Sequence, residues 1–203
     1  MGLHLLASHP KILSQLHNEV DAVLDGRPAT WNDIPQLELT RRILTETTRI
    51  HSPALLTTRR TTAETELGGI HIPAQTDLFL SPYILHLRSD AFPDPRTFDP
   101  DRWLPDRPAP PRGSCVPFGG GTPRCIGDDF ALTEAILALS TLTARFELRL
   151  DPSTTTSTLV RGAVGRIPSA CSSALVAMRR DSMIRAKAGS QSSQDLSSVP
   201  LNA

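Results

Sequence analysis

The sequence predicts a mainly α-helical protein with small β-sheets, that is, an α+β fold. Three segments carry apolar residues at helical spacing: residues 2–24, a second from about Leu37 to His51, and residues 126–146. The shorter segments between them are separated by Gly and Pro turns, a pattern typical of strands. A length of 203 residues suits one domain with a sizeable buried core.

The first helical segment is interrupted near His9 and Pro10, because proline restarts a helix at its first turn. Residues 25–28 end this segment with a turn, and residues 30–33 lead into the second helix. The buried stripe expected on the first segment consists of Leu13, Leu16, Val20, Val23 and Leu24.

The middle of the chain predicts short strands and then a long irregular loop. Prolines in residues 92–117 are too dense for a helix or a central strand. The same stretch carries Phe92, Phe98 and Trp103, and aromatic side chains favour burial, so we expect an ordered loop. The strands are expected over residues 54–62, 66–72 and 77–80, and one or two helical turns over residues 82–87.

The long third helix should be followed by strands and a tail. Residues 146–150 alternate apolar and charged side chains, as a strand does. Residues 159–167 and 174–178 are expected to be terminal strands, which places one domain over residues 1–180. Residues 181–203 are rich in Ser and Gln, and we expect a disordered tail there. The apolar residues of the third helix are Phe130, Leu132, Ile136, Leu137, Leu139 and Leu142.

Composition argues against several classes of function. A formal net charge of zero argues against nucleic acid or an anionic membrane as the main partner. No apolar run is long enough to span a bilayer, and residues 1–7 do not resemble a signal peptide. Three cysteines without a Cys-x-x-Cys pair favour a reducing, cytoplasmic setting. Cys115 and Cys171 are interpreted as small buried hydrophobic residues.

The most informative segment is residues 118–127, Phe-Gly-Gly-Gly-Thr-Pro-Arg-Cys-Ile-Gly. Its consecutive glycines allow the backbone to approach a flat ligand closely. Cys125 stands just before the third helix, where the helix dipole and unpaired N–H groups stabilise a thiolate suited to binding a metal. A single cysteine in such a loop is also commonly structural.

A second signal is Glu46 and Arg49, which lie three residues apart and share a helix face. The alternative for this pair is an ordinary exposed ion pair, worth well under ~1 kcal/mol.

The decamer resembles the haem-ligand loop of the cytochrome P450 family, Phe-x-x-Gly-x-x-x-Cys-x-Gly, and fills every fixed position of it. Residues 92–103 resemble that family's meander, with Asp101 in place of the usual Glu. The Glu-x-x-Arg pair, the meander and the Cys loop occur in the family's order. The resemblance covers roughly residues 3–150, which correspond to the C-terminal half of the family's fold.

The resemblance implies a haem-thiolate centre with heme b (iron protoporphyrin IX) and Cys125 as the iron ligand. It also implies that Glu46, Arg49 and Arg102 form a buried ionic triad. Where the family usually has an Arg or His as a propionate anchor, this chain has Pro123. The resemblance assigns the remaining cofactor-binding residues to Arg59, Phe118, Gly119, Gly121, Arg124 and Gly127.

By the same resemblance, the family's other propionate anchor corresponds to Arg59, with Arg60 as the alternative residue. The competing interpretation of this pair is two solvated arginines on an edge strand. Leu55 and Leu56 are the best candidates to touch a substrate.

By resemblance, the function is monooxygenation: one atom of O₂ enters an apolar organic substrate, with electrons from a redox partner. The expected donor is a ferredoxin with its reductase or a flavodoxin-like protein, docking near Arg112 and Arg124. The family's oxygen-activation helix has no counterpart here, so no catalytic residue is assigned and residues 1–203 alone are not expected to turn over substrate. The alternative is a truncated, inactive remnant acting at most as a haem-binding or interaction module.

Overall fold

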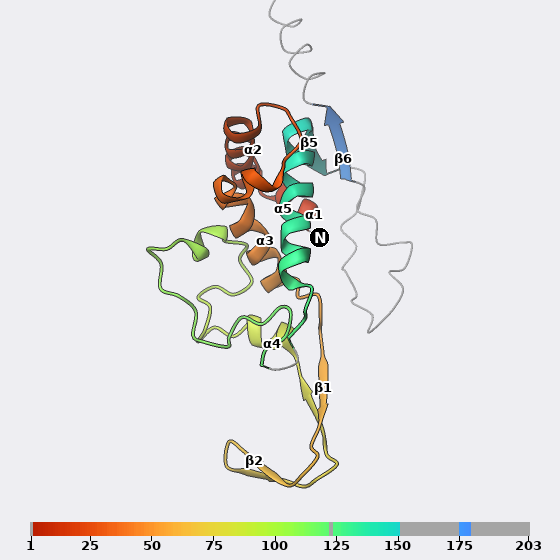
Figure 1. Ribbon diagram of the computed structural model, residues 1–203. Coiled ribbons are helices and arrows are strands. Elements are labelled where there is room, and N and C mark those ends of the chain that lie inside the picture. Colours follow the sequence, from red (N-terminus) through yellow and green to blue (C-terminus); the bar gives the residue numbers. More distant parts are fainter. Residues whose placement is uncertain (1, 122–123, 151–174, 180–203) are drawn as a thin grey trace, which may run out of the picture. The chain divides into compact units, whose positions relative to one another are not determined.

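The computed structural model describes residues 2–121, 124–150 and 175–179, and it confirms the predicted α+β fold (Figure 1). The helices are α1 (Gly2–Ser8), α2 (Pro10–Leu24), the 3-10 helix η1 (Trp31–Gln36), α3 (Glu38–Ile50), α4 (Pro82–His86), the 3-10 helix η2 (Pro100–Trp103) and α5 (Asp128–Arg145). The strands are β1 (Thr57–Arg60), β2 (Thr65–Leu67), β3 (Ile70–Ile72), β4 (Asp77–Leu80), β5 (Phe146–Leu150) and β6 (Leu175–Arg179).

The chain divides into two compact units. One contains residues 41–133, with most of α3, the small strands, the meander and the Cys loop. The other contains residues 2–40, 134–150 and 175–179. All the predicted site residues belong to the first unit.

The second unit has an apolar core, which is formed by side chains from residues 2–40 and from residues 134–150. Pro10 stands at the first turn of α2, as expected, after α1 has ended at Ser8. The buried apolar side chains of the second unit are Leu6, Leu13, Leu16, Val20, Leu24, Leu37, Ile136, Leu139, Ala144 and Leu148. Strand β5 pairs antiparallel with β6, so residues 146–150 form the predicted strand.

Glu19 of α2 caps the start of α3. Its Oε1 accepts a 2.6 Å hydrogen bond from the backbone N–H of Leu39, and its Oε2 accepts bonds of 2.9 and 2.7 Å from the N–H and hydroxyl of Thr40. The first N–H groups of a helix lack intrahelical partners, and a carboxylate also complements the positive end of the helix dipole. The beginning of α3 is therefore set by a residue about twenty positions earlier.

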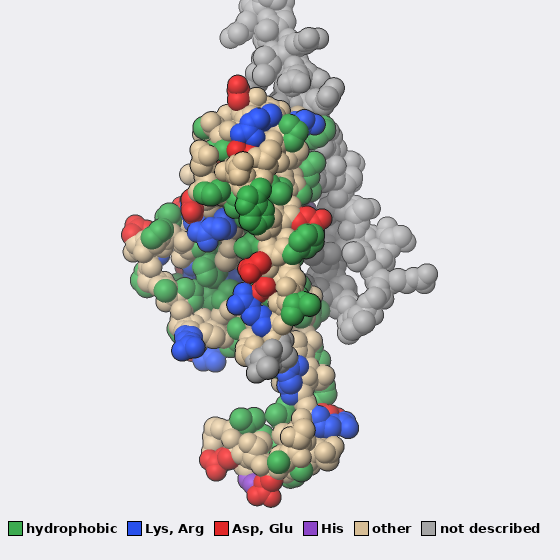
Figure 2. Space-filling view, in the orientation of Figure 1, with side chains coloured by type: hydrophobic (Ala, Val, Ile, Leu, Met, Phe, Trp, Pro, Cys, Tyr) green, Lys and Arg blue, Asp and Glu red, His purple; other side chains and the backbone are tan. Residues whose placement is uncertain are grey.

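In the first unit, β1 and β4 form an antiparallel ribbon with Arg60 opposite Asp77, and β2–β3 forms a hairpin at its far end (Figure 1). The single strand predicted over residues 66–72 is wrong, because Gly68 and Gly69 both take positive φ and turn the chain back. Hydrophobic side chains reach the hairpin surface, where Leu67 and Ile70 are more than half exposed (Figure 2).

The third predicted helix starts later than the sequence suggests. Helix α5 begins at Asp128, so Ile126 lies in the preceding loop and Cys125 stands three residues before the helix. Ile126 is fully exposed and Phe130 is 72% exposed, which places an apolar surface beside the Cys loop. The predicted strand 159–167, the predicted tail and Cys171 lie outside the described residues.

Candidate haem-thiolate site and its buried ionic cluster

Glu46 and Arg49 form a completely buried, bidentate ion pair on α3. Arg49 Nη2 donates to Glu46 Oε1 at 2.7 Å, and Arg49 Nε donates to Oε2 at 2.9 Å. Both side chains are 0% exposed, so the exposed-pair alternative is wrong. Two parallel N–H···O⁻ bonds hold the planar groups in a fixed orientation. Because both charges are removed from water, further hydrogen bonds to the pair are needed to offset the cost of burying them.

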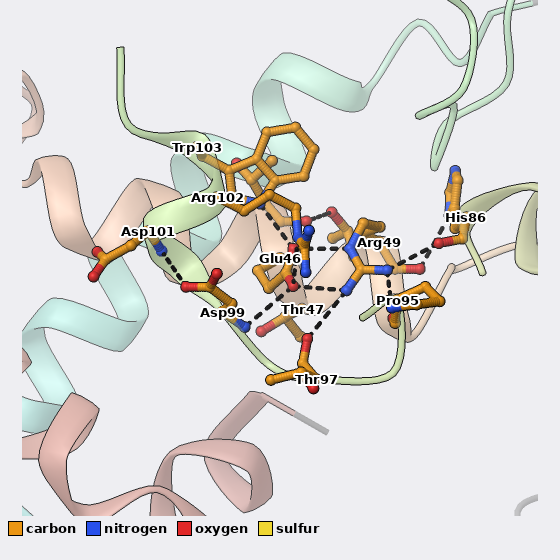
Figure 3. Close-up of polar contacts among 12 residues, drawn as sticks. Glu46, Thr47, Arg49, His86, Pro95, Thr97, Asp99, Asp101, Arg102 and Trp103 are labelled. Atoms are coloured by element: carbon orange, nitrogen blue, oxygen red, sulfur yellow. Dashed lines mark hydrogen bonds and ion pairs between the residues drawn. The ribbon is translucent and has the colours of Figure 1, made fainter. Parts of the chain in front are cut away.

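The meander supplies further partners to Glu46 (Figure 3). Trp103 donates its indole Nε1–H to Oε2 at 2.9 Å, and the backbone N–H of Asp99 donates to Oε1 at 3.2 Å. Arg102 Nε lies 3.5 Å from Oε1 as an ion pair without hydrogen-bond geometry. The carboxylate thus fastens η2 and the residue before it to α3.

The far side of the Arg49 guanidinium binds three backbone carbonyls of the same region. Nη1 donates to the carbonyl oxygens of His86 and Pro95 at 2.9 and 2.7 Å, and Nη2 donates to that of Thr97 at 3.3 Å. The guanidinium also lies 5.0 Å from the centre of the buried Phe92 ring. A fork of five N–H donors allows one side chain to hold both the end of α4 and the meander.

His86 ties this cluster to the chain that enters the Cys loop. Its ring is fully buried, its Nε2 accepts a 2.8 Å hydrogen bond from the backbone N–H of Val116, and its Nδ1 lies 3.0 Å from the carbonyl oxygen of Arg49. Burial lowers the pKa of His86, while the bond to the Arg49 carbonyl acts in the opposite direction. The imidazole is therefore held neutral.

The Cys loop is folded back on itself by backbone hydrogen bonds, one of which joins the Arg124 N–H to the Gly121 carbonyl at 3.3 Å. The N–H of Gly119 donates to the Val116 carbonyl at 3.1 Å, and the N–H of Cys125 donates to the Phe118 carbonyl at 3.0 Å. Gly119 and Gly121 have φ of 84° and 73°, a region that side chains other than glycine adopt with strain. The resulting turn presents Cys125 on an exposed surface.

Cys115 differs from Cys125 in its surroundings. Cys115 is partly buried, and desolvation raises the pKa of its thiol to about 11. A thiol with such a pKa stays protonated at neutral pH and is a poor metal ligand. Of the two described cysteines, only Cys125 is both exposed and placed in the glycine turn.

Comparison with known proteins identifies the family of this chain. The family model for cytochrome P450 matches residues 1–170. The chain belongs to the cytochrome P450 family.

Among curated proteins, it is 46% identical over 153 residues to cyclooctat-9-en-7-ol 5-monooxygenase of Streptomyces melanosporofaciens, covering 75% of this chain and 33% of that protein. It is 45% identical over 150 residues to pentalenene oxygenase of Streptomyces avermitilis, covering 73% and 33% respectively. It is 40% identical over 156 residues to cytochrome P450 27C1 of Danio rerio, covering 75% and 28%.

This P450 chain therefore spans about a third of the length of these relatives. No helix in the described ranges is long and apolar enough to cross a membrane. Within those same ranges, no group of three His, Cys, Asp or Glu side chains is arranged to hold a metal ion. A single thiolate ligand, as in a haem site, does not require such a group.

The structure brings together Glu46, Arg49 and Arg102 of the P450 residues expected from the sequence. The two arginines assigned to the cofactor, Arg59 and Arg124, each have a partner within the chain. Arg59 is exposed on β1 and donates to the neighbouring Thr58 carbonyl at 2.7 Å, while the alternative residue, Arg60, pairs with Asp77. Arg124 pairs with Asp128 at the start of α5. Pro123 lies outside the described residues.

Sequence reasoning missed the indole of Trp103, the N–H of Asp99 and the whole role of His86. Trp103 was expected to be buried as an aromatic, and the meander motif drew attention to Arg102 beside it. His86 ends a short helical turn in the stretch 81–86, which also resembles the family, but the sequence assigned no role to it. Its partners come from segments 37 and 30 positions away, so only the folded chain reveals them.

Proposed function

We propose that this chain forms the haem-binding part of a P450 monooxygenase, with Cys125 as the axial ligand of heme b. The observation that carries the proposal is the exposed Cys125, three residues before α5, in a turn in which Gly119 and Gly121 have positive φ. When bound through a thiolate, haem supplies the chemistry of O₂ activation, since the ligand favours O–O cleavage.

The donor set and the adjoining surface fit such a group. A thiolate is the ligand type of this haem class, and the glycine turn leaves room for a flat macrocycle. Ile126 and Phe130 expose apolar surface next to Cys125, and a macrocycle or a further apolar segment would cover it. Phe118 supports the turn by accepting the Cys125 N–H through its carbonyl.

The buried cluster serves this function by fixing the polypeptide below the ligand. Glu46 and Arg49 join α3, α4 and the meander through charge-assisted hydrogen bonds. Arg124 is oriented by Asp128, which stabilises the chain on the C-terminal side of the loop. Cys125 is thus presented by a loop with supports on both sides.

The names of two relatives support a substrate class, and the electron donor is a further part of the same proposal. Two relatives carry names that state oxygenation of cyclooctat-9-en-7-ol and of pentalenene. By analogy, we propose an apolar organic substrate for the protein that contains this chain. Electrons are proposed to come from a ferredoxin system or a flavodoxin-like donor in a reducing cytoplasm, with the exposed Arg112 helping to steer an acidic partner.

The test is a comparison of cysteine variants in the haem-loaded protein. Cys125→Ala is expected to lose the thiolate-type absorption of the ferrous–carbonyl form. Cys115→Ala is the matched control and is expected to keep it, since its thiol is protonated. A thiolate-type spectrum that survives Cys125→Ala, or that disappears with Cys115→Ala, would overturn the assignment.

A further inference from the structure

We propose that His86 is a positioning residue that sets the chain entering the Cys125 loop through one fixed tautomer. The inference rests on the proposed role of Cys125 for its functional meaning. Its structural content rests on two hydrogen bonds of a fully buried ring.

The tautomer follows from the donors around the ring. The backbone N–H of Val116 is a donor only, so Nε2 of His86 must be the unprotonated nitrogen that accepts it. In a neutral imidazole the proton is then on Nδ1, which donates to the carbonyl oxygen of Arg49. Both ring nitrogens are satisfied, and neither an imidazolium nor the other tautomer fits both partners.

The ring joins the end of α3 to the chain that enters the Cys loop. On one side stands the last turn of α3, held by the Glu46–Arg49 pair. On the other stands Val116, whose carbonyl accepts the N–H of Gly119 in the glycine turn. A further backbone hydrogen bond, from the Cys125 N–H to the Phe118 carbonyl, connects this turn to the residue that carries the thiol.

The side chain of Val116 also packs closely against the loop, at Gly120. A Cβ built on Gly120 would lie 3.3 Å from Cγ1 of Val116, tighter than an ordinary contact. A shift of Val116 therefore changes both the hydrogen bond to Gly119 and the space beneath Gly120. The position of the loop depends on where His86 places the Val116 N–H.

Two substitutions distinguish the roles of the two ring nitrogens of His86. His86→Gln places an amide oxygen near Nε2 and retains an acceptor for Val116, whereas His86→Asn places its amide near Nδ1 and loses that acceptor. His71→Gln is the matched control, because His71 is exposed on the β2–β3 hairpin. The Thr61 N–H, bonded to the Thr76 carbonyl at 3.0 Å, is an internal reference.

The primary measurement is amide hydrogen exchange of the haem-free protein. In His86→Asn, exchange at Val116 should rise about tenfold or more relative to Thr61, since one buried hydrogen bond is lost, and exchange at Cys125 should follow. His86→Gln should restore most of the protection, and His71→Gln should change nothing. Equal effects of Asn and Gln, or unchanged protection in His86→Asn, would show that the ring is only a packing element.

Two further readouts complete the test. In the unsubstituted protein, the ¹⁵N signals of the His86 ring should report Nδ1–H at neutral pH; an imidazolium or an Nε2–H form overturns the proposal even if both variants fail to fold. In the haem-loaded protein, His86→Asn should lower haem affinity about tenfold and His86→Gln should recover it. If the exchange results are as expected but Cys125→Ala keeps the thiolate-type spectrum, the positioning role of His86 stands and the haem assignment of Cys125 is wrong.

Discussion

Arg49 and His86 each donate a side-chain hydrogen bond to the other's backbone carbonyl. Arg49 Nη1 lies 2.9 Å from the His86 carbonyl oxygen, and His86 Nδ1 lies 3.0 Å from that of Arg49. The reciprocal pair locks the end of α3 to the end of α4, with both side chains 0% exposed. Truncating either side chain removes the donor that the other residue's carbonyl binds.

Loss of the central carboxylate should be the most destabilising single change in this cluster. Glu46→Ala leaves Arg49 charged and buried without its counter-ion, which typically costs about 3–5 kcal/mol in the free energy of unfolding. Chemical denaturation followed by circular dichroism measures this. Glu64→Ala is the control, since Glu64 is exposed, and it should be nearly neutral. If Glu46→Ala unfolds at the parent's midpoint, the cluster does not stabilise the fold.

Trp103→Phe separates the indole hydrogen bond from aromatic packing. Phenylalanine retains ring contact with Phe92, whose centroid lies 6.4 Å away, but removes the Nε1–H that Glu46 accepts. Because the acceptor is a buried carboxylate, unfolding free energy should fall by about 1.5–3 kcal/mol. Trp31→Phe is the matched control, as Trp31 is 69% exposed, and should change the denaturation midpoint little. Equal midpoints for the two variants would contradict the prediction.

The two described cysteines should react very differently with an alkylating reagent. With a pKa near 11, the thiolate fraction of Cys115 at pH 8 is about one thousandth, and the side chain is partly buried as well. Iodoacetamide followed by peptide mapping should therefore modify the exposed Cys125 first. Added haem should slow the labelling of Cys125 and leave that of Cys115 unchanged. Preferential labelling of Cys115 would contradict the assigned environments.

Acid should weaken the fold through His86. Burial lowers the folded-state pKa of His86 below its ordinary 6.5, so between these two values the unfolded chain binds more protons. The stabilising contribution is complete above pH 6.5 and is lost as pH falls through the lowered pKa. The Arg49 guanidinium nearby adds to the penalty for a charged ring. Denaturation midpoints measured across this window should drop more in the parent than in His86→Gln, and parallel curves would contradict the prediction.

The predicted fold was largely correct where local patterns determine structure. Apolar spacing located α2, α3 and α5 to within a few residues, and Pro10 marked the boundary between α1 and α2. The errors arose where one local pattern permits two outcomes. Residues 66–72 were predicted to be one strand, but Gly68 and Gly69 turn them into a hairpin. Helix α5 starts at Asp128 instead of Ile126, because apolar periodicity alone does not locate a helix end.

The candidate site was partly predictable for the same reason. Glu46 and Arg49 share a helix face, so their pairing follows from spacing of three. Their complete burial does not, because the covering Trp103 and Phe92 are more than forty residues away. Motif resemblance pointed to Arg102, whereas the closer contact on Glu46 is the indole beside it.

By itself, the sequence determined the mixed helical fold, the family motifs and the loop character of the Cys125 segment, since these depend on periodicity, proline density and glycine content. Only the tertiary structure decided which charges are buried and which backbone groups they bind. Arg49 reaches three carbonyls up to 48 positions away, and His86 meets partners on both sides of the cluster. Such contacts form because a buried charge or amide must find a partner wherever packing brings one within reach.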